Sequence, residues 1–201
     1  MIALRTLLYG GLLLFLCVAC RQEKAPEEEI LATTIEGGDT TATTTELQYL
    51  ELDLPDRNYL VFRQELSFRD INGFLAMESK ALRETATTAG IPTGGPYAVL
   101  TYEWDTERGW ADCAVALPVA ADTKLDPYVN ITLPATKALA LDLRGPYSAI
   151  SAYHVALDQE LRRRGLEATL PSIESYTVGP PEETDPANFV TRIIYPYKSA
   201  R

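Results

Sequence analysis

The segment that most suggests chemistry is Pro171-Ser172-Ile173-Glu174-Ser175-Tyr176-Thr177-Val178, a strand pattern with one carboxylate in its middle. Glutamate is a poor strand former, so Glu174 is either a solvated charge on an exposed strand or a charge directed into a pocket. Strand alternation puts Tyr176 on the face of Glu174. Because a carboxylate in a partly desolvated aromatic cleft attracts a cation, this pair is a candidate ligand-binding site.

Three aromatic residues from the preceding part of the chain are further candidates for the walls of such a site. Tyr102 and Trp104 are two positions apart, which predicts that they share one face of a strand. Trp110 follows a predicted turn and is expected at the mouth of the site. Each of the three could instead pack into a core, because large aromatic side chains dominate both settings.

The sequence offers few residues for metal or nucleophilic chemistry. Its one histidine, His154, lies in a helical pattern with no cysteine or second histidine near it. Cys113 lies in the apolar strand pattern of residues 111–117, which is typical of a buried, inert thiol. We therefore predict no metal site, no Ser-His-Asp triad and no cofactor.

The N-terminus has the pattern of an export signal. Arg5 is followed by an apolar run that ends in Val18-Ala19-Cys20, which predicts a secretory signal peptide over residues 1–19. The Val-Ala-Cys ending resembles a bacterial lipobox, and this makes Cys20 the expected lipidated first residue of the mature protein. The alternative is an uncleaved N-terminal anchor. Both interpretations predict an exported protein, attached to a membrane of the bacterial cell envelope.

Residues 20–48 are rich in glutamate and threonine and lack apolar periodicity. Such a composition cannot bury enough surface to offset the entropy of ordering, so we predict a disordered tether.

The formal net charge of the chain is −10, and an acidic protein repels nucleic acid. We therefore expect no nucleic-acid partner. The sequence gives no indication of an oligomeric state.

The remaining residues, 49–201, form one predicted domain that contains two similar halves, at about 58–120 and 130–198. In the first half, the pattern predicts a strand at 59–66, a helix from a Ser67/Asp70 capping box to Gly90, and strands at 96–104 and 112–119. In the second half, it predicts a strand at 137–143, a helix ending at Arg162-Arg163-Arg164-Gly165, and strands at 171–178 and 189–195.

Each half is thus a βαββ unit, and the predicted fold class is α+β. Two such units side by side would form a curved antiparallel sheet with both helices on one face. The other face is predicted to be a concave groove, and such a seam between repeats is a common place for small-molecule binding.

Several short motifs in this order resemble the GyrI-like small-molecule-binding family, which includes the effector-binding domains of AraC-type and MerR-type regulators. The motifs are Gly95-Pro96-Tyr97, Leu117-Pro118-Val119, Gly145-Pro146-Tyr147, Ile173-Glu174-x-Tyr176 and Pro196. The resemblance implies a pocket for amphipathic, often cationic, aromatic compounds, with Glu174 facing the positive charge of the ligand. Family members often carry an acidic residue where this chain has Ala114 and Arg192, so Arg192 could offset the charge of Glu174.

The leading functional prediction is a membrane-anchored lipoprotein that binds or sequesters an amphipathic, cationic or aromatic small molecule. A second possibility is a hydrolase of strained, cyclopropane-type compounds, an activity that the resemblance suggests. In that case Glu174 would act as a general base and Tyr102 or Tyr176 as a proton donor. A third is a structural envelope protein with a vestigial pocket.

Overall fold

The computed structural model describes residues 47–200. The predicted signal peptide, Cys20 and all but the last two residues of the predicted tether lie outside this range. None of the helices within residues 47–200 is both long and apolar enough to cross a membrane.

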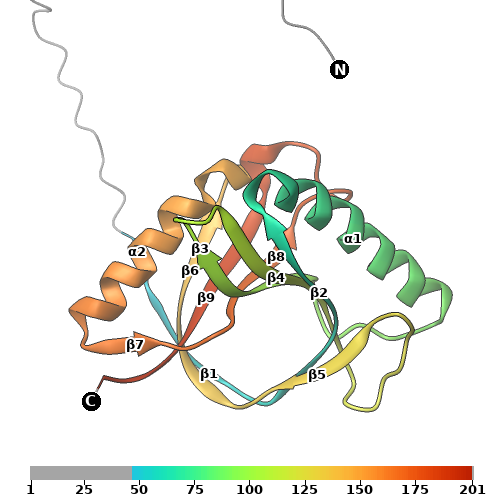
Figure 1. Ribbon diagram of the computed structural model, residues 1–201, viewed down its shortest axis with the longest axis horizontal. Coiled ribbons are helices and arrows are strands. Elements are labelled where there is room, and N and C mark those ends of the chain that lie inside the picture. Colours follow the sequence, from blue (N-terminus) through green and yellow to red (C-terminus); the bar gives the residue numbers. More distant parts are fainter. Residues whose placement is uncertain (1–46, 201) are drawn as a thin grey trace, which may run out of the picture. The chain divides into compact units, whose positions relative to one another are not determined.

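The described part of the chain is built on one antiparallel sheet with strand order β1-β6-β9-β8-β3-β4-β2-β5, and β7 pairs separately with β9 (Figure 1). The strands are β1 (Leu50–Leu54), β2 (Arg57–Ser67), β3 (Ala98–Asp105), β4 (Trp110–Val119), β5 (Val129–Leu133), β6 (Thr136–Arg144), β7 (Leu166–Ala168), β8 (Ser172–Val178) and β9 (Val190–Ser199).

One α-helix follows the first long strand of each half. Helix α1 (Phe68–Thr88) follows β2, and α2 (Ile150–Arg163) follows β6 after the short 3₁₀ helix η1 (Tyr147–Ala149). A second 3₁₀ turn, η2 (Pro186–Asn188), precedes β9. Gly90 and Gly165 have φ of 66° just beyond the two α-helices, which is the left-handed conformation that glycine adopts readily at helix ends. The α+β class and the two βαββ units are therefore as predicted.

The start of α1 differs from the predicted capping box. The Ser67 hydroxyl donates to the Asp70 carboxylate at 2.5 Å instead of capping a backbone N–H. A short side-chain hydrogen bond to a charged acceptor is a strong competitor for the hydroxyl. The acidic residue still lies in the first turn, where a negative charge suits the helix dipole.

The halves meet at the pairing of β3 with β8, in the middle of the sheet. They also exchange their outermost strands. Strand β1 precedes β2 in the chain but pairs with β6 of the second half, whereas β5 precedes β6 but pairs with β2 of the first half. Three strands were not predicted from the sequence: β1, β5 and β7, the shortest strands of the structure.

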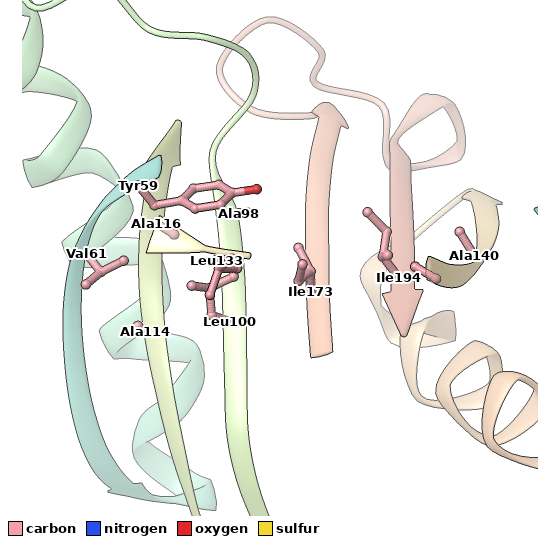
Figure 2. Packing of buried hydrophobic residues seen from close by; sticks show 11 residues of the cluster. Tyr59, Val61, Ala98, Leu100, Ala114, Ala116, Leu133, Ala140, Ile173 and Ile194 are labelled. Carbon is pink, nitrogen blue, oxygen red and sulfur yellow. The ribbon is translucent and has the colours of Figure 1, made fainter. Parts of the chain in front are cut away.

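The two faces of the sheet have separate cores. On one face, α1 covers a cluster around Leu60, Val99 and Val115, and α2 covers a cluster around Leu139 and Ile193. The other face is concave and carries an apolar cluster to which every strand from β1 to β6, β8 and β9 contributes (Figures 1 and 2). Side chains from β1 and β5, at opposite ends of the sheet, both pack on this cluster. The concave face is therefore lined by an apolar core of its own.

Candidate functional site

Glu174 lies at the centre of the sheet, on β8. Its register partners are Val99 of β3 and Ile193 of β9, and both of these residues belong to the clusters that the helices cover. Glu174 therefore points to the helix-bearing face, between α1 and α2. The prediction that Glu174 lies in a groove on the opposite face was wrong, because Ile173 and Ser175, not Glu174, point to the concave face.

Both oxygens of the Glu174 carboxylate accept hydrogen bonds. One is bonded to Nε2 of His154, on α2, at 2.8 Å, and the other to the hydroxyl of Tyr176. Nδ1 of His154 lies 3.0 Å from the hydroxyl of Tyr195. A neutral imidazole with its proton on Nε2 satisfies both neighbours, since it donates to the carboxylate and accepts from the Tyr195 O–H. In that arrangement the negative charge of Glu174 is held by hydrogen bonds but is not cancelled.

A cluster of aromatic rings lies beside this carboxylate. The rings of Tyr97 and Tyr176 stack with centroids 4.8 Å apart and only 4° between their planes. Tyr147 packs edge-on against Tyr176 at 5.2 Å and also contacts Phe189. Such offset stacks and edge contacts are the favoured geometries of aromatic pairs. The cluster thus joins residues of the loop before β3, of η1, of β8 and of the segment before β9, around the Tyr176 end of the Glu174 hydrogen-bond network.

Burial raises the pKa of three phenols around Glu174 and His154. Loss of solvent raises the pKa of Tyr176 well above its ordinary value, with the negative charge of Glu174 adding to the effect. Burial likewise raises the pKa of Tyr97 and raises that of Tyr195 to about 12. These three hydroxyls therefore remain hydrogen-bond donors throughout the neutral pH range.

A cavity of about 450 Å³ opens next to the stacked tyrosines. Its wall comes from the second half of α1, the loop before β3, the rings of Tyr97 and Tyr176, and the loop after β8. Arg83 lies over the Tyr97 ring at 5.1 Å from its centroid, and Glu182 contributes an opposite charge to the wall. The Glu174 carboxylate lies behind this wall, because it accepts a hydrogen bond from the hydroxyl of the wall residue Tyr176.

The cavity is also shaped by one close approach between side chain and backbone. A Cβ atom at Gly179 would collide with the Tyr147 hydroxyl oxygen, so a larger residue at this position would have to displace the Tyr147 ring. The Tyr147 hydroxyl is buried and has no hydrogen-bond partner among residues 47–200. Within the same residues, no group of three or more side chains is arranged to hold a metal ion.

Residues 47–198 match the family model of the GyrI-like small molecule binding domain. The chain belongs to this family. No curated protein matches it in sequence.

Solved structures agree with the GyrI-like fold. The chain is similar to EcmrR in its DNA complex (TM-score 0.65, 17% identity, 76% of this chain) and spans 58% of the EcmrR chain. It is similar to the isolated EcmrR C-terminal domain (TM-score 0.61, 17% identity), with 77% of this chain and 99% of that domain covered. SAV2435 bound to tetraphenylphosphonium is a further match (TM-score 0.56, 16% identity), with 76% and 94% covered. At these identities the likeness concerns the fold.

Within the GyrI-like domain, two of the five predicted binding residues, Glu174 and Tyr176, contact each other directly. Tyr102 lies on the concave face, where Arg63 covers its ring at 3.6 Å. Trp104, on β3, is 56% exposed and stacks on Phe68, the first residue of α1, with ring centroids 4.5 Å apart. Trp110, on β4, lies under Arg108. The prediction that these three line the cleft with Glu174 was wrong.

The separation of Tyr102 from Trp104 has a clear cause. The pairing of β3 with β4 shifts register between Thr101 and Glu103, and such a β-bulge adds a residue and reverses the alternation of the strand. Tyr102 therefore stays on the concave face with Leu100, whereas Trp104 turns to the face of α1. A sequence pattern of period two cannot show this shift.

The charge of Glu174 is not offset by Arg192, which the sequence left open. Arg192 lies on the concave face, opposite Ser175 and Asp142. It donates two hydrogen bonds to the Asp142 carboxylate, at 2.6 and 2.8 Å. This bidentate pair lowers the pKa of Asp142 chiefly through the hydrogen bonds from Arg192. The other departure from the family pattern, Ala114, is buried in the concave core.

Sequence reasoning missed His154 as a site residue because it was weighed only as a metal ligand or a catalytic triad member. The position of His154 in the helical pattern could have identified it as a site residue. It lies four residues after Ile150 and three before Leu157, on the stripe that α2 turns toward the sheet. A polar side chain on such a stripe needs a partner, and Glu174 is the partner here.

Proposed function

We propose that this GyrI-like domain binds an amphipathic aromatic small molecule with a positive charge, in the cavity beside Tyr97 and Tyr176. The observation that carries the proposal is the Glu174 carboxylate, whose side chain is only 15% exposed. It is held by two hydrogen-bond donors directly behind the aromatic wall. The stacked rings offer an apolar, polarizable surface to the ligand, and Glu174 supplies the opposite charge.

We further propose that the domain acts as an anchored binding protein. In this proposal, Cys20 carries the lipid, residues 20–48 hold the domain away from the membrane, and binding sequesters the ligand in the cell envelope. The absence of a nucleic-acid partner remains a prediction from the net charge of −10. Catalysis by Glu174 is not favoured, because both of its oxygens already accept hydrogen bonds and Tyr102 points to the other face.

The expected contribution of Glu174 follows from its distance to the cavity. A cation beyond the Tyr176 ring would lie roughly 7 Å from the carboxylate, and at an effective dielectric constant of about 20 their attraction is about 2 kcal/mol. Replacing Glu174 with glutamine should therefore weaken cation binding by roughly thirtyfold. An uncharged ligand of the same shape should lose little.

The test is calorimetric titration with tetraphenylphosphonium and with triphenylphosphine oxide, an uncharged compound with similar aryl groups. Calorimetry is preferable to tryptophan fluorescence because neither Trp104 nor Trp110 lines the cavity. Glu107→Gln is the matched control, since it removes the same charge from the exposed turn between β3 and β4. Equal affinities of wild type and Glu174→Gln for tetraphenylphosphonium would refute the role of Glu174.

A further inference from the structure

The concave face of the sheet carries a second cavity, of about 390 Å³, that is separate from the Glu174 network. Four residues of the apolar cluster, which Figure 2 labels, form part of its wall: Tyr59, Ala98, Ile173 and Ile194. The loop at Gly95 and Pro96 contributes to both cavities and therefore stands between them.

One polar group in this second cavity has no partner. Nε of Arg57, at the start of β2, is buried and makes no hydrogen bond within residues 47–200. None of the ion pairs among these residues includes Arg57, whereas two other arginines on this face, Arg63 and Arg192, each hold a carboxylate. Burying a guanidinium N–H without an acceptor is costly. Because Arg57 lines the cavity and its guanidinium has no ion pair among residues 47–200, the guanidinium is suited to an acceptor that enters the cavity from outside the chain.

The other groups that line the cavity indicate which kind of acceptor would fit beside Arg57. Asp56 lines the same cavity, but its Oδ1 accepts the backbone N–H of Ala135 at 2.7 Å, so this oxygen is used within the fold. The Ser175 hydroxyl also faces the cavity and makes no side-chain hydrogen bond among the described residues. Beyond these groups the wall is mostly aliphatic, with Leu54, Ile173 and Ile194.

We propose that this concave-face cavity is a second binding site, which accepts a small organic acid with an apolar body. The carboxylate of the acid would take hydrogen bonds from the guanidinium of Arg57 and the hydroxyl of Ser175, and its apolar part would lie on the aliphatic wall. Arginine forks match the geometry of a carboxylate. A ligand of opposite charge to the one proposed for the Glu174 cavity would thus occupy the opposite face of the same sheet.

Calorimetric titration of the full chain with octanoate, with 1-octanol as the uncharged probe, tests the site. We expect octanoate to bind at least tenfold more tightly than 1-octanol. Arg57→Gln should weaken octanoate binding by roughly tenfold or more, because a hydrogen bond to a charged group is removed, and should leave 1-octanol within twofold. Arg69→Gln, which removes an exposed charge from α1, should change neither.

Three results would overturn the proposal: no octanoate binding, equal affinities for octanoate and 1-octanol, or an Arg57→Gln variant that binds octanoate like the wild type. Circular dichroism of each variant shows whether the fold is kept. Saturation with tetraphenylphosphonium should leave octanoate binding in place, and competition between the two would contradict separate sites. Because the proposed function is tested with tetraphenylphosphonium and Glu174→Gln, the two proposals can fail independently.

Discussion

Replacing Glu160 with glutamine should destabilise the domain in a way that depends on pH. Glu160, near the end of α2, has a side chain only 9% exposed. It accepts two hydrogen bonds from Arg163 and one from Arg164, all at 2.6 Å. Arg164 also reaches Glu51 of β1 at 2.5 Å. These bonds, with those of Arg163 as the largest cause, lower the pKa of Glu160 from 4.5 to about 2.

The size of the effect follows from that shift. Each pKa unit corresponds to 1.36 kcal/mol, so the lowered pKa alone would represent about 3 kcal/mol. The side chain of Arg163 is 71% exposed, and solvent screening reduces the contribution of such a pair. We therefore expect Glu160→Gln to lower the free energy of unfolding at pH 7 by roughly 1–2 kcal/mol, which is about 3–6 °C in Tm for a domain of this size.

The pH dependence has a definite sign. Because the pKa of Glu160 is lower in the folded state, the stabilisation is fully present above pH 4.5 and is lost as the pH falls toward 2. Urea denaturation followed by circular dichroism at pH 7, 4 and 2.5 should show the difference between wild type and Glu160→Gln shrinking in that order. Glu167→Gln, with a 57% exposed side chain and one ion pair, is the control. A difference that is constant with pH would refute the reasoning.

Three further substitutions test the packing around the site. Leu157→Ala should destabilise the domain by about 2–5 kcal/mol in urea denaturation, because Leu157 is fully buried between α2 and the sheet. The control is Val155→Ala, on the exposed side of the same helix, which should change the free energy of unfolding by no more than about 0.5 kcal/mol. Tyr176→Phe removes a donor from the Glu174 carboxylate and should cost about 1–3 kcal/mol in the same assay; an unchanged stability would contradict the bond. Gly179→Ala should displace the Tyr147 ring, which a shift of the aromatic proton resonances of that ring would report, and unshifted resonances would argue against the contact.

The fold was predictable from the sequence to the extent that periodicity determines it. The long strands and both helices carry clear patterns of apolar residues, and Gly90 and Gly165 mark helix ends by their backbone freedom. The short strands β1, β5 and β7 were missed because five residues or fewer hold little periodic signal. Strands β1 and β5 pair with strands of the other half, and β7 pairs with β9 near the end of the chain. No local sequence pattern predicts these pairings.

The candidate site was predictable only along a single strand. Glu174 and Tyr176 are two residues apart on β8, and their alternation brought them together as expected. Tyr97 comes from the loop before β3 and His154 from α2, and their contacts with these residues depend on how the helix packs and how the halves join. The choice of sheet face could not be read from alternation, because alternation separates two faces without saying which one the helices cover.

The exchange of β1 and β5 between the halves has a consequence for any attempt to divide the protein. A fragment ending before β6 would keep β1 but lose the strand to which β1 pairs, and a fragment beginning at β6 would lack the strand that covers its outer edge. Each fragment would have an edge strand whose backbone amides and carbonyls lack hydrogen-bond partners. Two such pieces could recover these bonds by joining each other, so co-expressed halves should reassemble, whereas either alone should aggregate.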